Sequence, residues 1–147
     1  MSPQLVKNIK WAEAPGGWPI LKAYQDPKGI WTIGYGRNLQ VLEITASQAE
    51  AWLNEDICAA IREAEKSPSW KYLDTQARRD ALIELVYNMG PEPFDGDGYK
   101  DFKNTMAAIA RKDWKAAAAH LLDSKWRQDV GPARSNRIAK QLETGEY

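Results

Sequence analysis

The chain has 147 residues, with 20 basic and 20 acidic side chains and a formal net charge of zero. A chain of this length is expected to fold as one domain and to bury roughly 70% of the surface that is exposed when it is unfolded. It therefore needs no disulfide or metal to stabilise the fold. Zero net charge without a clustered basic helix excludes a typical nucleic-acid-binding protein. The N-terminus has no apolar run of the kind found in signal peptides or membrane spans, so we expect cytosolic synthesis without membrane insertion.

The single cysteine, Cys58, excludes a disulfide framework and a thiolate metal site. Because it lies in a helical pattern, we expect it to be a small buried apolar residue. Residues 95–98 read Asp-Gly-Asp-Gly, but the carboxylate that a calcium loop needs at its twelfth position is missing. We therefore expect no metal and no cofactor.

The first expected element is a helix over residues 3–13, which Pro15-Gly16-Gly17 ends. Glu13 falls at its C-terminus, where the negative end of the helix dipole disfavours ionisation of a carboxyl group. A carboxyl group in such a place suits a proton donor. Considered without the hairpin, however, Glu13 is better explained as a solvated glutamate at a helix end.

Residues 21–41 are the only β-rich segment, and Asp26-Pro27-Lys28-Gly29 supplies the turn of a hairpin. In a three-residue loop closed by a left-handed glycine bulge, Asp26 faces Ile30, and Asp26 and Thr32 become diagonal neighbours on one face. A carboxylate and a hydroxyl at that spacing can hold one water molecule. A two-residue turn would shift the register by one and separate the two side chains.

The rest of the chain is predicted to be helical. A capping box at residues 45–48 begins a helix of roughly 20 residues that ends before Ser67-Pro68 and could connect a small β-containing lobe to a helical lobe. Further helices are expected at 75–90 and near 102–112, 114–123 and 132–144. No repeat with a period of 20 to 50 residues is present.

Three blocks of the chain resemble the phage-type lysozymes, the endolysins. They are Glu13 with the hairpin at residues 21–36, the segment 81–90, and the segment 113–137 with its closing Thr144-Gly145. The resemblance implies an α+β, mainly helical fold with two lobes, a small β-hairpin lobe and a larger helical lobe joined by a long helix. It further implies a single catalytic domain over residues 1–147, with the hairpin lobe at about 14–66 and the helical lobe at about 1–13 and 67–147.

The same resemblance assigns roles to individual residues. Glu13 becomes the general acid on the glycosidic oxygen, Asp26 the carboxylate that activates water, and Thr32 the hydroxyl that helps to place this water. This is the inverting arrangement, which needs the two carboxyl groups roughly 6.5–9.5 Å apart. The family's sugar contacts and supporting arginines correspond to Asn38, Tyr87, Thr105, His120, Arg134 and Arg137. Arg134 matches the arginine that reaches and orients the catalytic glutamate.

The chain departs from the family pattern in two places. About four extra residues, Pro-Gly-Gly-Trp at 15–18, stand between Glu13 and Tyr24. The segment between Gly36 and the long helix is short, which leaves little room for a full three-stranded β lobe. Arg37 takes a position where relatives often have histidine.

The resemblance implies a muramidase that cleaves the β-1,4 bond of bacterial peptidoglycan between N-acetylmuramic acid and N-acetylglucosamine. A lytic transglycosylase is the alternative enzyme, although that reaction has no use for a water-holding pair. A catalytically inactive glycan-binding relative is the non-enzymatic alternative. By the same resemblance we expect a monomer that a separate membrane pore releases from the host cytoplasm to the cell wall, without a nucleic-acid partner.

Overall fold

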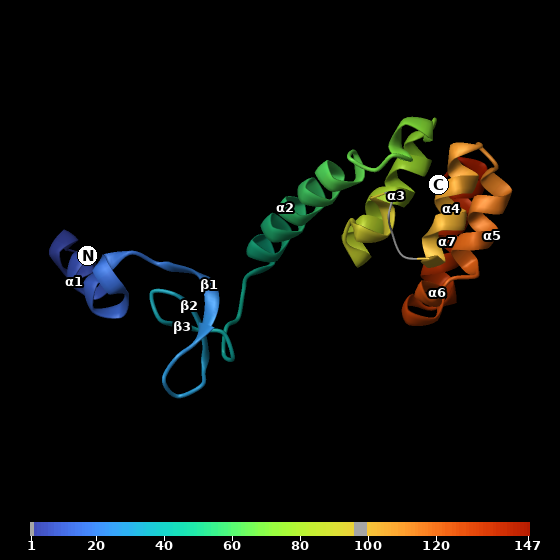
Figure 1. The fold of residues 1–147 in the computed structure, drawn as a ribbon. Coiled ribbons are helices and arrows are strands. Elements are labelled where there is room, and N and C mark those ends of the chain that lie inside the picture. Colours follow the sequence, from blue (N-terminus) through green and yellow to red (C-terminus); the bar gives the residue numbers. More distant parts are fainter. Residues whose placement is uncertain (1, 96–99) are drawn as a thin grey trace. The chain divides into compact units, whose positions relative to one another are not determined.

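The computed structural model describes residues 2–95 and 100–147. They fall into two compact units, Met1–Ala49 and Glu50–Tyr147. The described residues form seven α-helices and one small antiparallel sheet, so the predicted mainly helical α+β fold is confirmed (Figure 1). The assignment of residues 1–13 to a helical lobe stays a prediction.

The first unit begins with the helix α1 (Pro3–Glu13), followed by the short 3-10 helix η1 (Pro15–Gly17) and a sheet. Its strands are β1 (Ile20–Gln25), β2 (Trp31–Gly34) and β3 (Arg37–Asn38), paired in that order. The Ser2 side chain caps α1 by accepting a hydrogen bond from the backbone nitrogen of Leu5 at 3.2 Å. The sequence left little room for a third strand, and β3 is accordingly only two residues long.

The second unit is helical. The helix α2 (Ala46–Ala64) begins at the predicted capping box, in the last residues of the first unit, and continues into the second. The Thr45 nitrogen donates to the Gln48 side chain at 2.9 Å, and the Gln48 nitrogen donates back to the Thr45 hydroxyl at 3.2 Å. The described residues of the second unit also form the helices α3 (Gln76–Met89), α4 (Lys100–Ala110), α5 (Trp114–Leu122), α6 (Lys125–Val130) and α7 (Pro132–Thr144). Two short 3-10 helices, η2 (Trp70–Tyr72) and η3 (Glu92–Phe94), precede and follow α3 in the chain. The helix α6 is not predicted by the sequence, because it is short and has no side-chain cap.

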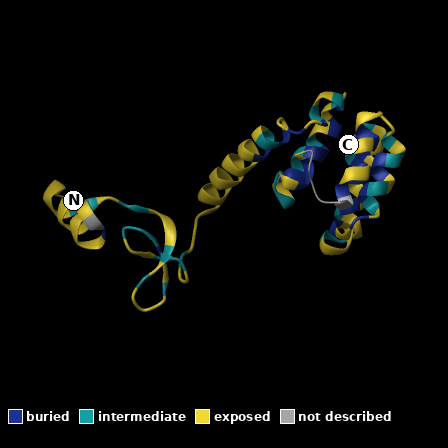
Figure 2. Cartoon of the chain, viewed as in Figure 1, coloured by how far each residue is buried: buried dark blue, intermediate teal, exposed yellow. Residues whose placement is uncertain are grey.

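The core of the second unit is built from aliphatic and aromatic residues of its helices, as the dark blue segments of Figure 2 show. Fully buried members include Leu73, Leu82, Phe94, Ile109, Leu121, Ile138 and Leu142. Cys58 does not join this core and is exposed, contrary to the expectation from sequence. The reason is that α2 has buried residues only in its last turns, at Ala60 and Ala64.

A buried arginine ties α3 to the end of α7. Arg78 is 7% exposed and donates from Nε to the carbonyl of Leu142 and from Nη2 to the carbonyl of Glu143, both at 2.9 Å. Its Nη1 also bonds Asp74 at 2.8 Å, and its guanidinium lies 4.0 Å from the ring centroid of Trp114. The last carbonyls of a helix have no partner within that helix, so Arg78 satisfies groups that α7 leaves open.

Candidate active site

The turn between β1 and β2 has the bulged form that the sequence predicts. Gly29 has a left-handed φ of 77°, and its nitrogen donates to the carbonyl of Asp26 at 2.9 Å. The Asp26 nitrogen donates to the carbonyl of Ile30 at 3.0 Å, and Tyr24 pairs with Thr32. This register confirms the predicted hairpin and puts Asp26 and Thr32 on the same face.

The Asp26 carboxylate is held by the loop that it precedes. Its Oδ1 accepts hydrogen bonds from the backbone nitrogens of Lys28 at 2.8 Å and Ile30 at 2.9 Å. Such side chain to backbone bonds are the mechanism by which aspartate stabilises turns. Because both bonds go to Oδ1, the other carboxylate oxygen keeps its capacity to accept a hydrogen bond from water.

Thr32 provides a hydroxyl in a fixed orientation. The residue is 5% exposed, and its Oγ1 donates to the carbonyl of Ile30 at 3.0 Å. With its only proton committed in this way, the hydroxyl oxygen can act only as an acceptor toward a further ligand. Asn38 pairs with Thr32 across β2 and β3, and its side chain accepts from the Gln40 nitrogen at 2.8 Å.

Glu13 lies beside the turn between β2 and β3, despite the insertion that follows it. A Cβ built on Gly36 would stand only 2.8 Å from the Oε2 atom of Glu13, so the carboxyl group lies against the bare Cα of this glycine. The Tyr35 hydroxyl also donates to the carbonyl of Gly17 at 3.4 Å, which joins the inserted segment to the sheet. The structure therefore brings the predicted acid to the same small sheet as Asp26 and Thr32.

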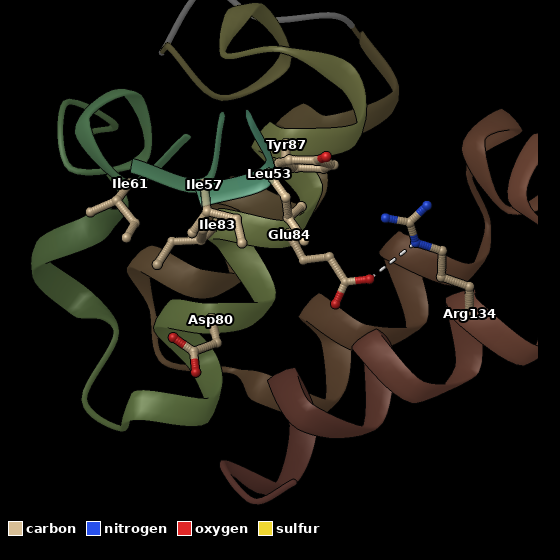
Figure 3. A pocket seen from close by; sticks show the side chains of 8 residues that line it. All are labelled: Leu53, Ile57, Ile61, Asp80, Ile83, Glu84, Tyr87 and Arg134. Atoms are coloured by element: carbon tan, nitrogen blue, oxygen red, sulfur yellow. Dashed lines mark hydrogen bonds and ion pairs between the residues drawn. The ribbon is translucent and has the colours of Figure 1, made fainter. Parts of the chain in front are cut away.

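The other predicted sugar-binding residues belong to the second unit. Tyr87 is 44% exposed and lines a pocket of about 450 Å³ together with Leu53, Ile57, Ile61, Asp80, Ile83, Glu84 and Arg134 (Figure 3). His120 is half-buried on α5. Thr105 is fully buried, and within the described residues its hydroxyl has no hydrogen-bond partner, so a sugar cannot reach it in this structure. The sugar-binding roles of Asn38, Tyr87, Thr105 and His120 stay predictions.

Arg134 and Arg137 converge on an acid that is not predicted from the sequence. The Nε of Arg134 bonds Oε1 of Glu84 at 3.0 Å, and the Nη2 of Arg137 bonds the same oxygen at 2.7 Å (Figure 3 shows the first pair). The only local signal for Glu84 is that a charged residue interrupts the apolar run of 81–86. The role of Arg134 in orienting Glu13 stays a prediction.

Comparison with known proteins gives a family. A family model described as phage lysozyme matches residues 19–141 of the chain. The chain belongs to the phage lysozyme family. Lysozymes degrade the glycan strands of bacterial cell walls, so the chain is a peptidoglycan-lytic enzyme of the glycosidase type. Asp26 and Thr32 lie within the matched residues, whereas Glu13 precedes them.

Individual relatives of this lysozyme cover most of its length. It is 30% identical over 155 residues to a probable T4-type lysozyme of Dictyostelium discoideum, which covers 85% of the chain and 87% of the relative. It is 44% identical over 113 residues to the endolysin of Acyrthosiphon pisum secondary endosymbiont phage 1, with coverage of 72% and 68%. The endolysin of Salmonella phage P22 is 33% identical over 118 residues, with coverage of 74% and 75%.

Residues 2–95 and 100–147 contain no cluster of three or more histidine, cysteine or acidic side chains that could bind a metal ion. In the same residues, no helix combines the length and the apolar character needed to span a bilayer. Most of the segment considered as a calcium loop, residues 96–98, lies outside the described residues.

The Glu84 cluster makes the stability of this lysozyme depend on pH in a defined direction. Burial raises the pKa of Glu84, but hydrogen bonds and charges from Arg137 and Arg134 outweigh it and hold the pKa below its ordinary value of 4.5. The unfolded chain therefore binds this proton more readily than the folded chain. The stabilisation is complete above about pH 4.5 and is lost as the pH falls through the lowered pKa.

We expect Glu84→Gln to lower the free energy of unfolding at pH 7 by about 1–3 kcal/mol, since charge-assisted hydrogen bonds are lost. Urea unfolding of both proteins between pH 7 and pH 3 should show this difference shrinking below about pH 4.5. Glu63→Gln is the control, because Glu63 pairs with Lys66 at an exposed site and should cost less than about 1 kcal/mol. A difference that grows toward acid pH would contradict this account of the cluster.

Proposed function

We propose that this lysozyme is a muramidase, which hydrolyses the β-1,4 bond between N-acetylmuramic acid and N-acetylglucosamine with inversion at the anomeric carbon. The observation that carries the proposal is the hairpin face on which a fixed Asp26 carboxylate accompanies the Thr32 hydroxyl. Both groups can accept a hydrogen bond from the same water molecule. A water that donates both protons in this way directs its lone pair away from the protein, toward a sugar carbon.

The reaction follows from these roles and is balanced in protons. Water attacks the anomeric carbon while Asp26 takes one of its protons, and Glu13 gives its proton to the glycosidic oxygen as the sugar bond breaks. The new carbon–oxygen bond forms on the face opposite to the departing sugar. Asp26 ends protonated and Glu13 ionised, and proton exchange with solvent restores both groups.

The products of cell-wall digestion test this function. After digestion of purified peptidoglycan, mass spectrometry of the borohydride-reduced fragments should find muramic acid at every new reducing end. Glucosamine at those ends would mean cleavage of the other glycosidic bond. Anhydro-muramyl ends would identify a lytic transglycosylase, and no soluble fragments from a folded protein would identify an inactive glycan-binding relative.

The contact between Glu13 and Gly36 gives a matched pair of variants. Gly36→Ala adds a methyl group 2.8 Å from Oε2 of Glu13 and should displace its carboxyl group, lowering the rate of wall clearing by roughly tenfold to a hundredfold. Gly34→Ala is the control. Both glycines have a left-handed backbone, with φ of 69° at Gly34 and 80° at Gly36, so both substitutions cause similar backbone strain, but a Cβ on Gly34 meets no atom within 4 Å. Equal rates of wall clearing per folded molecule for the two variants would show that Gly36 does not hold the carboxyl group of Glu13 in place.

The monomeric state and release through a separate membrane pore complete the proposal and rest on the endolysin resemblance. Size-exclusion chromatography tests the first. The second predicts that cells producing the enzyme lyse only when their inner membrane is permeabilised, and lysis of intact producing cells would contradict it.

A further inference from the structure

A second pocket lies entirely within the first unit. It measures about 450 Å³ and is formed by α1, the residues of η1 with the following Trp18, and Tyr35 in the turn after β2. The side chains that matter for its chemistry are Lys7, Lys10, Trp11, Trp18 and Tyr35, which we call the Trp–Lys pocket. Neither Glu13, Asp26 nor Thr32 lines it. Trp18 belongs to the insertion that distinguishes this chain from the family pattern.

The two tryptophans expose unusually large apolar faces. Trp11 is 71% exposed and Trp18 is 78% exposed, although indoles are highly buried on average. A Cβ on Gly16 would lie 3.7 Å from Cδ1 of Trp18, and one on Gly17 would lie 3.6 Å from Cδ1 of Trp11. The Cδ1 edge of each indole therefore lies near a glycine of the turn, while most of the side-chain surface is exposed. Rigid aromatic faces of this kind can bind a ligand at low cost in side-chain entropy.

The polar part of the pocket is positively charged. Lys7 and Lys10 line it, and the Nζ of Lys10 lies 5.4 Å from the ring centroid of Tyr35. No acidic side chain lines this pocket, and among the described residues neither lysine forms an ion pair. Two ammonium groups beside two exposed indoles complement a ligand that combines flat apolar faces with carboxylates.

We propose that the Trp–Lys pocket binds peptidoglycan at a second position, apart from the bond that is cleaved. Sugar rings pack their C–H faces on Trp11 and Trp18, and carboxylates of the stem peptides pair with Lys7 and Lys10. This inference rests on the proposed function, because it takes the substrate polymer of that function as its ligand. The Tyr35 hydrogen bond to Gly17 links the pocket to the sheet that carries Asp26, so binding there raises the local concentration of strand near the hairpin.

Binding to purified sacculi with intact stem peptides tests the proposal, measured by sedimentation of the full chain carrying Asp26→Asn to prevent digestion. In this background, Trp11→Ala with Trp18→Ala should raise the dissociation constant about tenfold, a loss of about 1.4 kcal/mol. Lys7→Gln with Lys10→Gln should raise it several-fold at low salt and remove most of its salt dependence. The matched controls are Trp52→Ala, an exposed tryptophan outside the pocket, and Lys22→Gln with Lys115→Gln.

The outcomes separate this inference from the function on which it rests. Unchanged binding by both pocket variants, with circular dichroism showing them folded, would overturn it even if the wild-type chain produces muramic acid ends. Removal of the stem peptides by an amidase should weaken sacculus binding by the Asp26→Asn chain to the level of the variant with Lys7→Gln and Lys10→Gln. Undiminished binding would contradict the proposed contact between the lysines and stem-peptide carboxylates. If the pocket variants bind sacculi as well as the Asp26→Asn parent does but no longer bind phosphatidylglycerol vesicles that the parent binds, the pocket belongs to a membrane surface and the proposal is overturned.

Discussion

Asp26→Asn is expected to reduce clearing of a turbid cell-wall suspension by about 10²–10⁴-fold, the usual contribution of a general base, while the protein stays folded. Asparagine retains the side-chain oxygen that accepts from the nitrogens of Lys28 and Ile30, so the hairpin turn survives the change. What is lost is the ability to take a proton from water. Turbidity assays with circular dichroism measure both effects.

Glu13→Gln should reduce clearing to a similar extent, because the amide cannot protonate the glycosidic oxygen. Asp129→Asn serves as the control, since Asp129 is an exposed acid on α6 outside the proposed site. Wild-type activity in Glu13→Gln would show that the acid is wrongly assigned. Loss of activity in Glu13→Gln alone, with Asp26→Asn still active, would favour the transglycosylase, which needs an acid and no activated water.

The largest expected effect on stability comes from Arg78. Truncation to alanine leaves two carbonyls at the end of α7 without their donor and removes the contact with Trp114. We expect Arg78→Ala to lower the free energy of unfolding by about 3–5 kcal/mol, because two hydrogen bonds from a charged group to carbonyls and a cation–π contact are lost together. At roughly 2–4 °C per kcal/mol for a chain of this size, the melting temperature should fall by about 6–20 °C.

The neighbouring arginine provides the comparison. Arg79 is exposed. Its side chain donates to the carbonyl of Leu73 at 3.2 Å and has a looser contact with Trp70 at 5.6 Å, so Arg79→Ala should cost less than about 1.5 kcal/mol. The loss of unfolding free energy for Arg78→Lys should lie between those of Arg78→Ala and Arg79→Ala, because lysine keeps the charge but lacks the planar guanidinium that reaches both carbonyls. Similar melting temperatures for Arg78→Ala and Arg79→Ala would contradict the assigned role of Arg78.

The parts of the fold that the sequence predicts well are those fixed by local chemistry. Asp26, Pro27 and Gly29 determine the hairpin register within five residues, and Thr45 with Gln48 starts α2 through hydrogen bonds across three residues. Periodicity is less informative about burial along a helix. Cys58 follows the helical pattern of α2, yet that pattern cannot tell where the core of the second unit ends.

The candidate site divides in the same way. Asp26 and Thr32 follow from one turn, whereas the convergence of Arg134 and Arg137 on Glu84 spans 50 and 53 residues and has no local signature. Glu13 stands between these cases. Family resemblance selects it across an insertion, and only the folded chain reveals its carboxyl group against Gly36.

The stereochemistry of the first product tests the central claim, that the Asp26 and Thr32 face of the hairpin directs water onto the far side of the sugar. Proton NMR of a soluble peptidoglycan oligosaccharide, recorded within seconds of adding enzyme and before mutarotation, resolves the anomer released. We expect the α-anomer of N-acetylmuramic acid, because water attacks a β-linked carbon from the opposite face. Initial release of the β-anomer would mean retention, and Asp26 would then act as a nucleophile or have no part in the reaction.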